Sequence, residues 1–328
     1  IIIQAMNGEN SINCVHDAQV ELSFNGSQKL ATTATGIAVT GEVAASQDYP
    51  NYRPTLDFNF AAVKKLDSRF TYQRTGPASY VDEFGFVRLS AYNVPRFDHD
   101  PVTGECKGLL IEQNSTNLVP NSQNIGSHGF QHTDGVTVTY ANDVTAPDGT
   151  TGSVLKLVSD SSTGYHGVQH NVSGFGSNQN WAYQVWVKAL SGSSINSVAL
   201  YDNSQSGATN NGSIRMTTTT GVLTNNGNSG ESVAYNNGWY QIKIKGTRAT
   251  TNANSSMFLT LHNGTTNSFA GDGSSGFYVW GGQYENDTNI WTSYVPTDGE
   301  TRTRGGETLT IEGEEFSDFY NQNEGTLL

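Results

Sequence analysis

The stretch VELSFNGSQKLATTATGIAVTGEV (residues 20–43) decides the fold class, because apolar and polar residues alternate in short runs that turns interrupt. Asn25-Gly26 supplies the positive φ angles that a tight hairpin needs. A sheet this thin cannot bury its own apolar face, so neighbouring chains must cover it. The apolar residues predicted to share that face are Val20, Leu22, Phe24, Leu30, Ile37 and Val39.

The composition of the whole chain favours an all-β protein. Gly, Asn, Ser and Thr are abundant among the 328 residues, and charged residues make up 14%. No long apolar periodicity of the 3.6-residue kind is present, so helix is expected to be scarce. A chain of this length has room for two domains and one sizeable core.

The charge balance limits the classes of partner. The formal net charge is −13, from 17 basic and 30 acidic side chains. This charge argues against binding to nucleic acid or to an anionic bilayer through a basic patch. The sequence contains no run of about 18 apolar residues, so no segment is expected to span a membrane. Neutral partners such as sugars are compatible with this charge.

Four segments can be drawn along the chain. We expect a fibre module at residues 1–45, a linker and connector at 46–114, a β-sandwich at 115–300 and the start of a further domain at 301–328. Strand-like runs separated by Gly/Asn/Ser-rich loops predict the sandwich. Because the chain opens on Ile1 and closes on an unpaired Leu327-Leu328, we expect it to be part of a longer polypeptide.

The resemblance to a known family rests on a series of motifs. Residues 20–43 resemble a β-module of bacteriophage tail fibres, in which three chains interlock. The later motifs resemble a series found in phage structural proteins, where it leads into a jelly-roll domain similar to carbohydrate-binding modules. These motifs are TLDF (55–58), YQR (72–74), YVD (80–82), PRFDHD (95–100), GLLIE (108–112), TNL (116–118), GFYVWGGQ (276–283) and SYVPT (293–297).

The resemblance implies a fold and a function. The fold would be a short intertwined trimeric β fibre module followed by a carbohydrate-binding-module-like jelly roll. The protein would be a virion fibre or appendage, assembled in the host cytoplasm as a homotrimer, with other virion proteins and a host cell-surface glycan as partners. Three alternatives stay open: a purely structural head fibre or connector, a polysaccharide depolymerase, and a bacterial adhesin or filament subunit.

Strand alternation predicts a sugar-binding face. In WAYQVWVK (181–188), Tyr183, Val185 and Val187 would face the core, and the side chains between them would face outward. Aromatic faces stack on sugar rings while amides and amines bind hydroxyls. The alternative is that the Trp residues pack under loops or against another protomer. The predicted face consists of Gln184, Trp186, Lys188, Tyr201, Trp239 and Gln241.

One group of residues has catalytic potential. Tyr165 and His166, with His170 four residues later, could act as base and acid in a polysaccharide lyase. No acidic or Arg partner can be assigned to them, and the signatures of other enzyme classes are absent. We therefore expect ordinary surface or core histidines and no enzymatic activity.

The remaining polar motifs predict no cofactor. Asp98 to Asp100, followed by Gly104-Glu105, partly matches a calcium loop, but Val102 stands where an oxygen ligand is required. A plain turn is favoured there, although the resemblance allows a structural calcium elsewhere. Cys14 and Cys106 lie in separate segments without a spacing signature, which is typical of a protein made in a reducing cytoplasm.

Overall fold

The computed structural model describes residues 2–4, 8–16, 18–40, 58–123, 132–173, 179–202, 213–247 and 254–317. The chain divides into two compact units, residues 1–55 and 56–328. The predicted boundary at residue 45 lies outside the described residues. No helix among the described residues is both long and apolar enough to cross a membrane.

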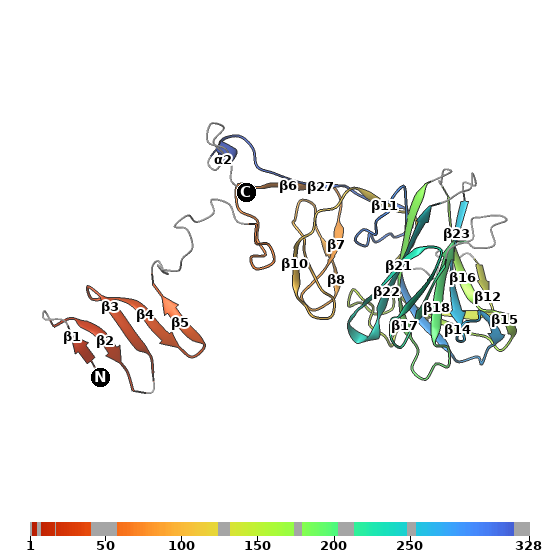
Figure 1. The fold of residues 1–328 in the computed structure, drawn as a ribbon, viewed down its shortest axis with the longest axis horizontal. Helices are drawn as coiled ribbons and strands as arrows, with labels where there is room; N and C mark the ends of the chain where they lie inside the picture. The colour runs from red at the N-terminus through yellow and green to blue at the C-terminus, as the bar shows by residue number, and fades with distance from the viewer. Residues whose placement is uncertain are drawn as a thin grey trace. The chain divides into compact units, whose positions relative to one another are not determined.

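The first unit is one five-stranded antiparallel meander, in the order β1-β2-β3-β4-β5 (Figure 1). Asn25 and Gly26 both have positive φ angles, 49° and 71°, which confirms the predicted hairpin turn between β3 and β4. The strands are β1 (Ile2–Gln4), β2 (Asn10–Cys14), β3 (Val20–Phe24), β4 (Ser27–Thr33) and β5 (Gly36–Val39).

The second unit contains a β-sandwich of two six-stranded antiparallel sheets, which confirms the predicted all-β class. The β16 sheet has the order β12 (His132–Asp134), β16 (Gly167–Ser173), β23 (Asn254–His262), β18 (Ser197–Asp202), β19 (Ser213–Thr217) and β20 (Leu223–Asn226). The β17 sheet has the order β13 (Val136–Ala141), β14 (Val154–Ser159), β25 (Gly276–Asn286), β17 (Asn180–Ala189), β22 (Tyr240–Thr247) and β21 (Ser229–Ala234).

The main core lies between these two sheets. Alternate residues of each strand point into it, as a half-buried sheet requires. Tyr183, Val185 and Val187 face this core from β17, as predicted. Ile242 and Ile244 face it from β22, and both are fully buried.

A connector of short strands precedes the sandwich and packs on it. Its strands are β6 (Thr71–Arg74), β7 (Ala78–Val81), β8 (Val87–Ser90), β9 (Phe97–His99), β10 (Cys106–Leu109) and β11 (Ser115–Asn117). The shorter elements elsewhere are β15 (Thr163–Tyr165), β24 (Ser268–Ala270), β26 (Arg302–Arg304), β27 (Glu307–Thr310), the 3-10 helix η1 (Asn236–Gly238) and the helix α2 (Glu314–Ser317).

The end of the described chain returns to the connector. Strand β26 pairs with β11, and β27 pairs with β6 so that Thr71 lies opposite Thr310 (Figure 1). The further domain predicted at residues 301–328 thus begins, in the described residues, with two strands that pair with the connector. The sequence could not reveal this, because strand pairing between segments more than 200 residues apart leaves no local pattern.

Buried charges join the same two segments. We call Arg74, Arg96, Glu112, Arg304 and Glu307 the arginine cluster. The Glu307 carboxylate accepts hydrogen bonds from Arg74 (3.0 Å), Arg96 (2.8 and 2.7 Å) and the Tyr72 hydroxyl (2.6 Å). Glu112 accepts from Arg96 at 2.9 Å and also from Arg304. Each charge therefore has an opposite partner, as buried charges require.

Candidate functional site

The predicted sugar-binding face is covered. Trp186 is 1% exposed, and its ring lies 5.2 Å from that of Trp280 and 5.4 Å from that of Tyr294. Trp239 is also buried, and its indole donates to the Thr145 carbonyl at 2.9 Å. These residues form a second core, to which Val81 and Val87 of the connector contribute. The prediction that this face is open is therefore wrong, and the alternative that its Trp residues pack under other segments is correct.

The amides of the predicted face bond to each other and to the chain. Gln241 donates to Gln184 Oε1 at 3.0 Å, and Gln184 donates to the Thr292 carbonyl at 2.9 Å. Both side chains are buried, while Lys188 is half-buried. Each amide thus has at least one hydrogen-bond partner inside the protein, as buried amides normally do.

Tyr201 lies on a different sheet from the other predicted residues. It belongs to β18 in the β16 sheet, so grouping it with Trp186 was wrong. Its ring stacks on Phe258 of β23 with centroids 4.8 Å apart and planes 4° apart. The Tyr165 hydroxyl lies 3.1 Å from that of Tyr201, and its ring meets Phe258 edge to face. All three side chains are half-buried, which leaves part of each accessible.

Polar residues flank this aromatic group. Strand register places Gln169, Phe258, Tyr201 and Ser213 in one row across four strands, on the face of the sheet opposite the core. Beside the row, Asn171 accepts hydrogen bonds from Gln169 at 3.0 Å and from Ser256 at 2.7 Å. We call Tyr165, Tyr201, Phe258 and Gln169 the tyrosine patch.

Both tyrosines of the patch remain neutral at ordinary pH. Burial raises the pKa of Tyr165, and its hydrogen bond with Tyr201 raises it further. Burial also raises the pKa of Tyr201, against the opposing effect of that hydrogen bond. Neutral phenols can both donate to and accept from hydroxyl groups, so the patch combines apolar ring surface with hydrogen bonding. The outward alternation of Phe258 between Met257 and Leu259 was the signal that could have identified it from sequence.

The residues with catalytic potential do not converge on an open groove. His166 and His170 are fully buried; His166 stacks on Phe269, and His170 lies 2.9 Å from the Tyr183 hydroxyl. Burial lowers the pKa of His170 to about 3, so its ring is neutral. These positions are those of core histidines.

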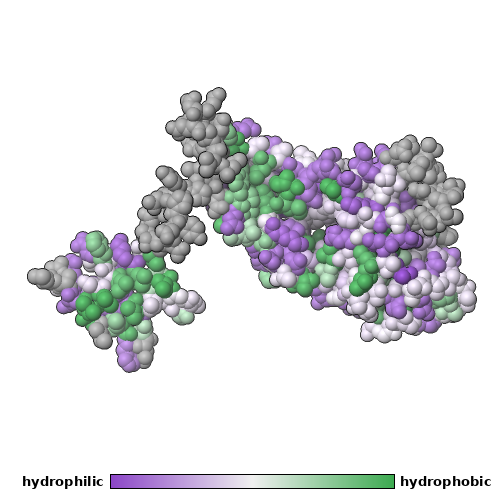
Figure 2. Space-filling view, in the orientation of Figure 1, coloured by the Kyte–Doolittle hydropathy of each residue, from purple (hydrophilic) through white to green (hydrophobic). Residues whose placement is uncertain are grey.

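The predicted trimerisation residues share one face of the first unit. Register aligns Ile3, Ile12, Leu22, Leu30 and Val39 in one row across all five strands. Val20, Phe24 and Ile37 lie on the same side by alternation, and Figure 2 shows apolar surface gathered on this unit. Phe24 is 73% exposed and Ile37 is 65% exposed. The opposite face carries the hydrogen bond between Asn13 and Glu21, and their row also contains Ile2, Ala31 and Ala38.

The segment that partly matches a calcium loop forms a turn. Asp100 Oδ1 accepts from the backbone N–H groups of Val102 and Thr103, both at 2.9 Å, and Asp98 accepts from Val81 at 2.8 Å. Within the described part of the chain, no three His, Cys, Asp or Glu side chains group closely enough to hold a metal ion.

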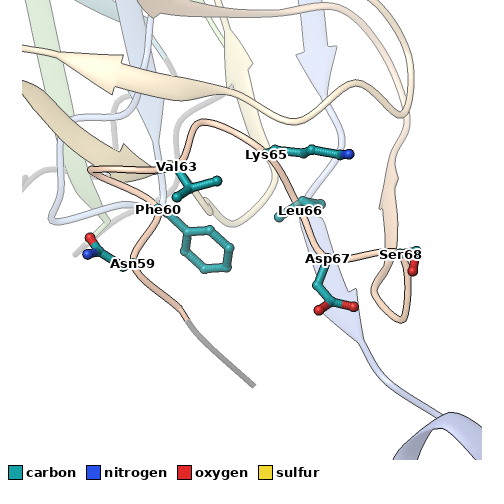
Figure 3. Close-up of a pocket in the computed structure, with 7 residues that line it drawn as sticks. All are labelled: Asn59, Phe60, Val63, Lys65, Leu66, Asp67 and Ser68. Carbon is teal, nitrogen blue, oxygen red and sulfur yellow. The ribbon is translucent and has the colours of Figure 1, made fainter. Parts of the chain in front are cut away.

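A further hollow of about 380 Å³ lies at the start of the connector (Figure 3). Phe60, Val63 and Leu66 point into it, and Lys65 and Asp67 lie along its rim. Phe60 also contacts Phe58 and Phe70 edge to face, with centroids 5.8 and 6.2 Å apart. No motif in the sequence marks this hollow, whose lining combines three apolar side chains with polar and charged ones.

Comparisons with known proteins give partial structural likeness. No family model and no curated protein matches the chain. The CBM22-1 xylan-binding domain of Paenibacillus barcinonensis Xyn10C is 11% identical, covering 54% of this chain and 94% of that domain, with a TM-score of 0.32. TmCBM61, solved with β-1,4-galactotriose, is 11% identical, covering 51% and 97%, with a TM-score of 0.30. The CBM22-1–GH10 modules of Clostridium thermocellum Xyn10B are 14% identical, covering 56% and 30%, with a TM-score of 0.32. At these scores the likeness bears on neither family nor ligand.

Proposed function

We propose that this chain is a homotrimeric appendage protein of a bacteriophage virion that attaches to host surface glycans without cleaving them. The observation that carries the proposal is the one-sided apolar face of the first unit. Five strands expose a continuous row from Ile3 to Val39, and no core lies beneath it within the described residues. Exposed apolar surface of this extent is typical of an interface.

Trimeric assembly would also serve attachment. A weak sugar site repeated on one assembly gains avidity through effective concentration, so millimolar affinity at each site is sufficient. The number three and the virion location come from the resemblance of residues 20–43 and the later motifs to phage fibre proteins.

The tyrosine patch is the proposed glycan site. It supports the proposal because Tyr201 and Phe258 present aromatic surface beside neutral hydroxyl and amide groups. This combination suits an uncharged sugar chain better than an ionic ligand. The purely structural alternative is favoured by a different observation, the burial of Trp186 and Trp239.

A glycan array probed with the fluorescent full chain tests the proposal. The wild type is expected to bind at least one bacterial polysaccharide, and Tyr201→Ala with Phe258→Ala is expected to weaken this binding about tenfold or more. Tyr92→Ala is the matched control, since Tyr92 is exposed and lies in the connector. Absence of binding by the assembled wild type would favour a structural role, and release of reducing ends would favour the depolymerase.

A further inference from the structure

A cavity of about 190 Å³ lies between the connector and the outer face of the β17 sheet. Gln241 and Lys243 of β22 and Glu231 of β21 form part of its floor. Tyr80 and Asp98 contribute from the connector, and Trp291 contributes from the segment after β25. The cavity is the space that the connector leaves unfilled where it covers this sheet.

Its floor holds polar groups in a fixed arrangement. Strand register places Glu231, Lys243 and Gln184 side by side, and Val233, Gln241 and Trp186 in the next row. Lys243 Nζ lies 3.3 Å from Glu231 Oε1. Gln241 gives its amide N–H to Gln184, while its oxygen receives a long 3.4 Å contact from the Tyr235 hydroxyl. The floor thus keeps both donor and acceptor capacity.

The opposite wall supplies an acceptor. Asp98 Oδ1 is bonded to the Val81 N–H at 2.8 Å, whereas its second oxygen has no donor among the described residues. Burial raises the pKa of Asp98. This oxygen is therefore available to accept a hydrogen bond from a ligand or a water molecule in the cavity.

The aromatic wall is rigid. The Trp291 indole donates to the Ile244 carbonyl at 3.1 Å, and Lys245 Nζ lies 4.4 Å from the ring centroid. Lys243 Nζ lies 5.9 Å from the same ring. A fixed indole beside donors and acceptors of both charges is the set of groups that sugar rings contact.

Size and charge narrow the class of ligand. The volume is far above the ~10–15 Å³ that one water needs and below the ~300 Å³ of sites for drug-sized molecules. The acidic lining residues Asp98, Glu112 and Glu231 are nearly balanced by Lys107 and Lys243, and Glu112 is already held by Arg96 and Arg304. A small neutral ligand fits this balance better than an ion.

We propose that this cavity binds a single neutral sugar unit, with Asp98, Gln241 and Lys243 bonding its hydroxyls beside Trp291. The proposal deepens the proposed glycan attachment, but the cavity is separate from the tyrosine patch and lies on the other sheet. The two sites can therefore be tested independently.

Saturation-transfer NMR on the full chain tests whether the cavity binds a sugar. The probes are D-glucose, D-galactose, D-mannose and N-acetyl-D-glucosamine. We expect transfer to at least one sugar at concentrations up to about 50 mM, with a dissociation constant of order 1 mM or weaker. Lys243→Met, which keeps the aliphatic stem, should weaken binding about tenfold, and Asp98→Asn should weaken it as well. Lys156→Met is the matched control, because Lys156 is a half-buried lysine on β14 of the same sheet and does not line the cavity.

Several results would overturn the proposal. One is absence of transfer to all four sugars by the folded wild type. Another is equal binding by wild type, Lys243→Met and Asp98→Asn, each with an unchanged melting temperature. Loss of monosaccharide binding in Tyr201→Ala with Phe258→Ala would move the site to the tyrosine patch. Loss of polysaccharide binding in that variant, with monosaccharide binding retained, would support both sites.

Discussion

The guanidinium of Arg96 forms two hydrogen bonds with the carboxylate of Glu307, at 2.8 and 2.7 Å, across 211 residues of sequence. Both side chains are completely buried. The pair holds the connector to the segment that follows the sandwich. Because Glu307 also accepts from Tyr72 and Arg74, its removal would leave two buried arginines short of a partner.

Glu307→Ala is expected to lower the free energy of unfolding of the second unit by about 3–5 kcal/mol, because it leaves buried charge uncompensated. Urea denaturation of the full chain measures this change. Glu83→Ala, which breaks the exposed pair with Lys64, is the control and should have little effect. Equal effects of the two substitutions would contradict the structural role of the arginine cluster.

The free energy of unfolding should fall as the pH drops below the pKa that His170 has in the unfolded chain. Its folded pKa, about 3, lies below the value near 6.5 in the unfolded chain, so only the unfolded state takes up a proton between them. The stabilisation that comes from the lowered pKa of His170 is fully present above pH 6.5. About 2 kcal/mol of it is lost by pH 5. His262, with a pKa lowered by burial to about 4, adds a loss of the same sign.

His170→Gln should flatten this dependence, since glutamine can still bond the Tyr183 hydroxyl but does not titrate. Denaturation curves collected at intervals from pH 7 to pH 5 measure the slope. Identical slopes for the variant and the wild type would show that His170 is not neutral and buried in solution.

Leu22→Glu should weaken self-association, because it puts a charge in the middle of the apolar row of the first unit. We expect the dissociation constant to rise by at least about tenfold in sedimentation equilibrium of the full chain. Ser23→Glu is the matched control, since Ser23 is the next residue on the same strand and faces the other side of the sheet. A wild type that sediments as a monomer at micromolar concentration would reject the assembly altogether.

Trp186→Ala should act on stability, with an expected loss of about 3–5 kcal/mol in the free energy of unfolding. The reason is that the indole fills the core between the connector and the β17 sheet. Phe84→Ala, at an exposed connector position, is the control. A Trp186→Ala protein with unchanged stability would mean that this face is open, as the alternation pattern had suggested.

Local pattern was enough for some features and insufficient for others. Alternation in residues 181–188 correctly divided Val185 and Val187 from Trp186, and Asn25-Gly26 correctly marked a hairpin. Alternation gives the side of a strand but not what covers that side. The cover over Trp186 comes from residues near 81–87 and from Tyr294, and their packing depends on tertiary contacts that leave no period in sequence.

The same limit explains the misplacement of Tyr201. Its strand alternates as expected, but which sheet it joins is set by pairing with β23 and β19. Tyr165, Tyr201 and Phe258 span 94 positions of the sequence. Only the folded structure shows that they form one patch. The residues predicted to mediate trimerisation, by contrast, lie within one short meander, and their common face was predictable from local sequence.

The pairing of β6 with β27 determines how the second unit would respond to mechanical tension along the chain. Thr71 and Thr310 lie opposite each other, and Arg74 lies opposite Glu307 at the far end of the pair. Tension applied to the residues before Thr71 and after Thr310 would therefore act first on the Thr71–Thr310 end of the β6–β27 pair. The strands would separate from that end toward the buried charges. The β-sandwich lies between these two strands in the sequence, so it would experience no tension until β6 and β27 had separated.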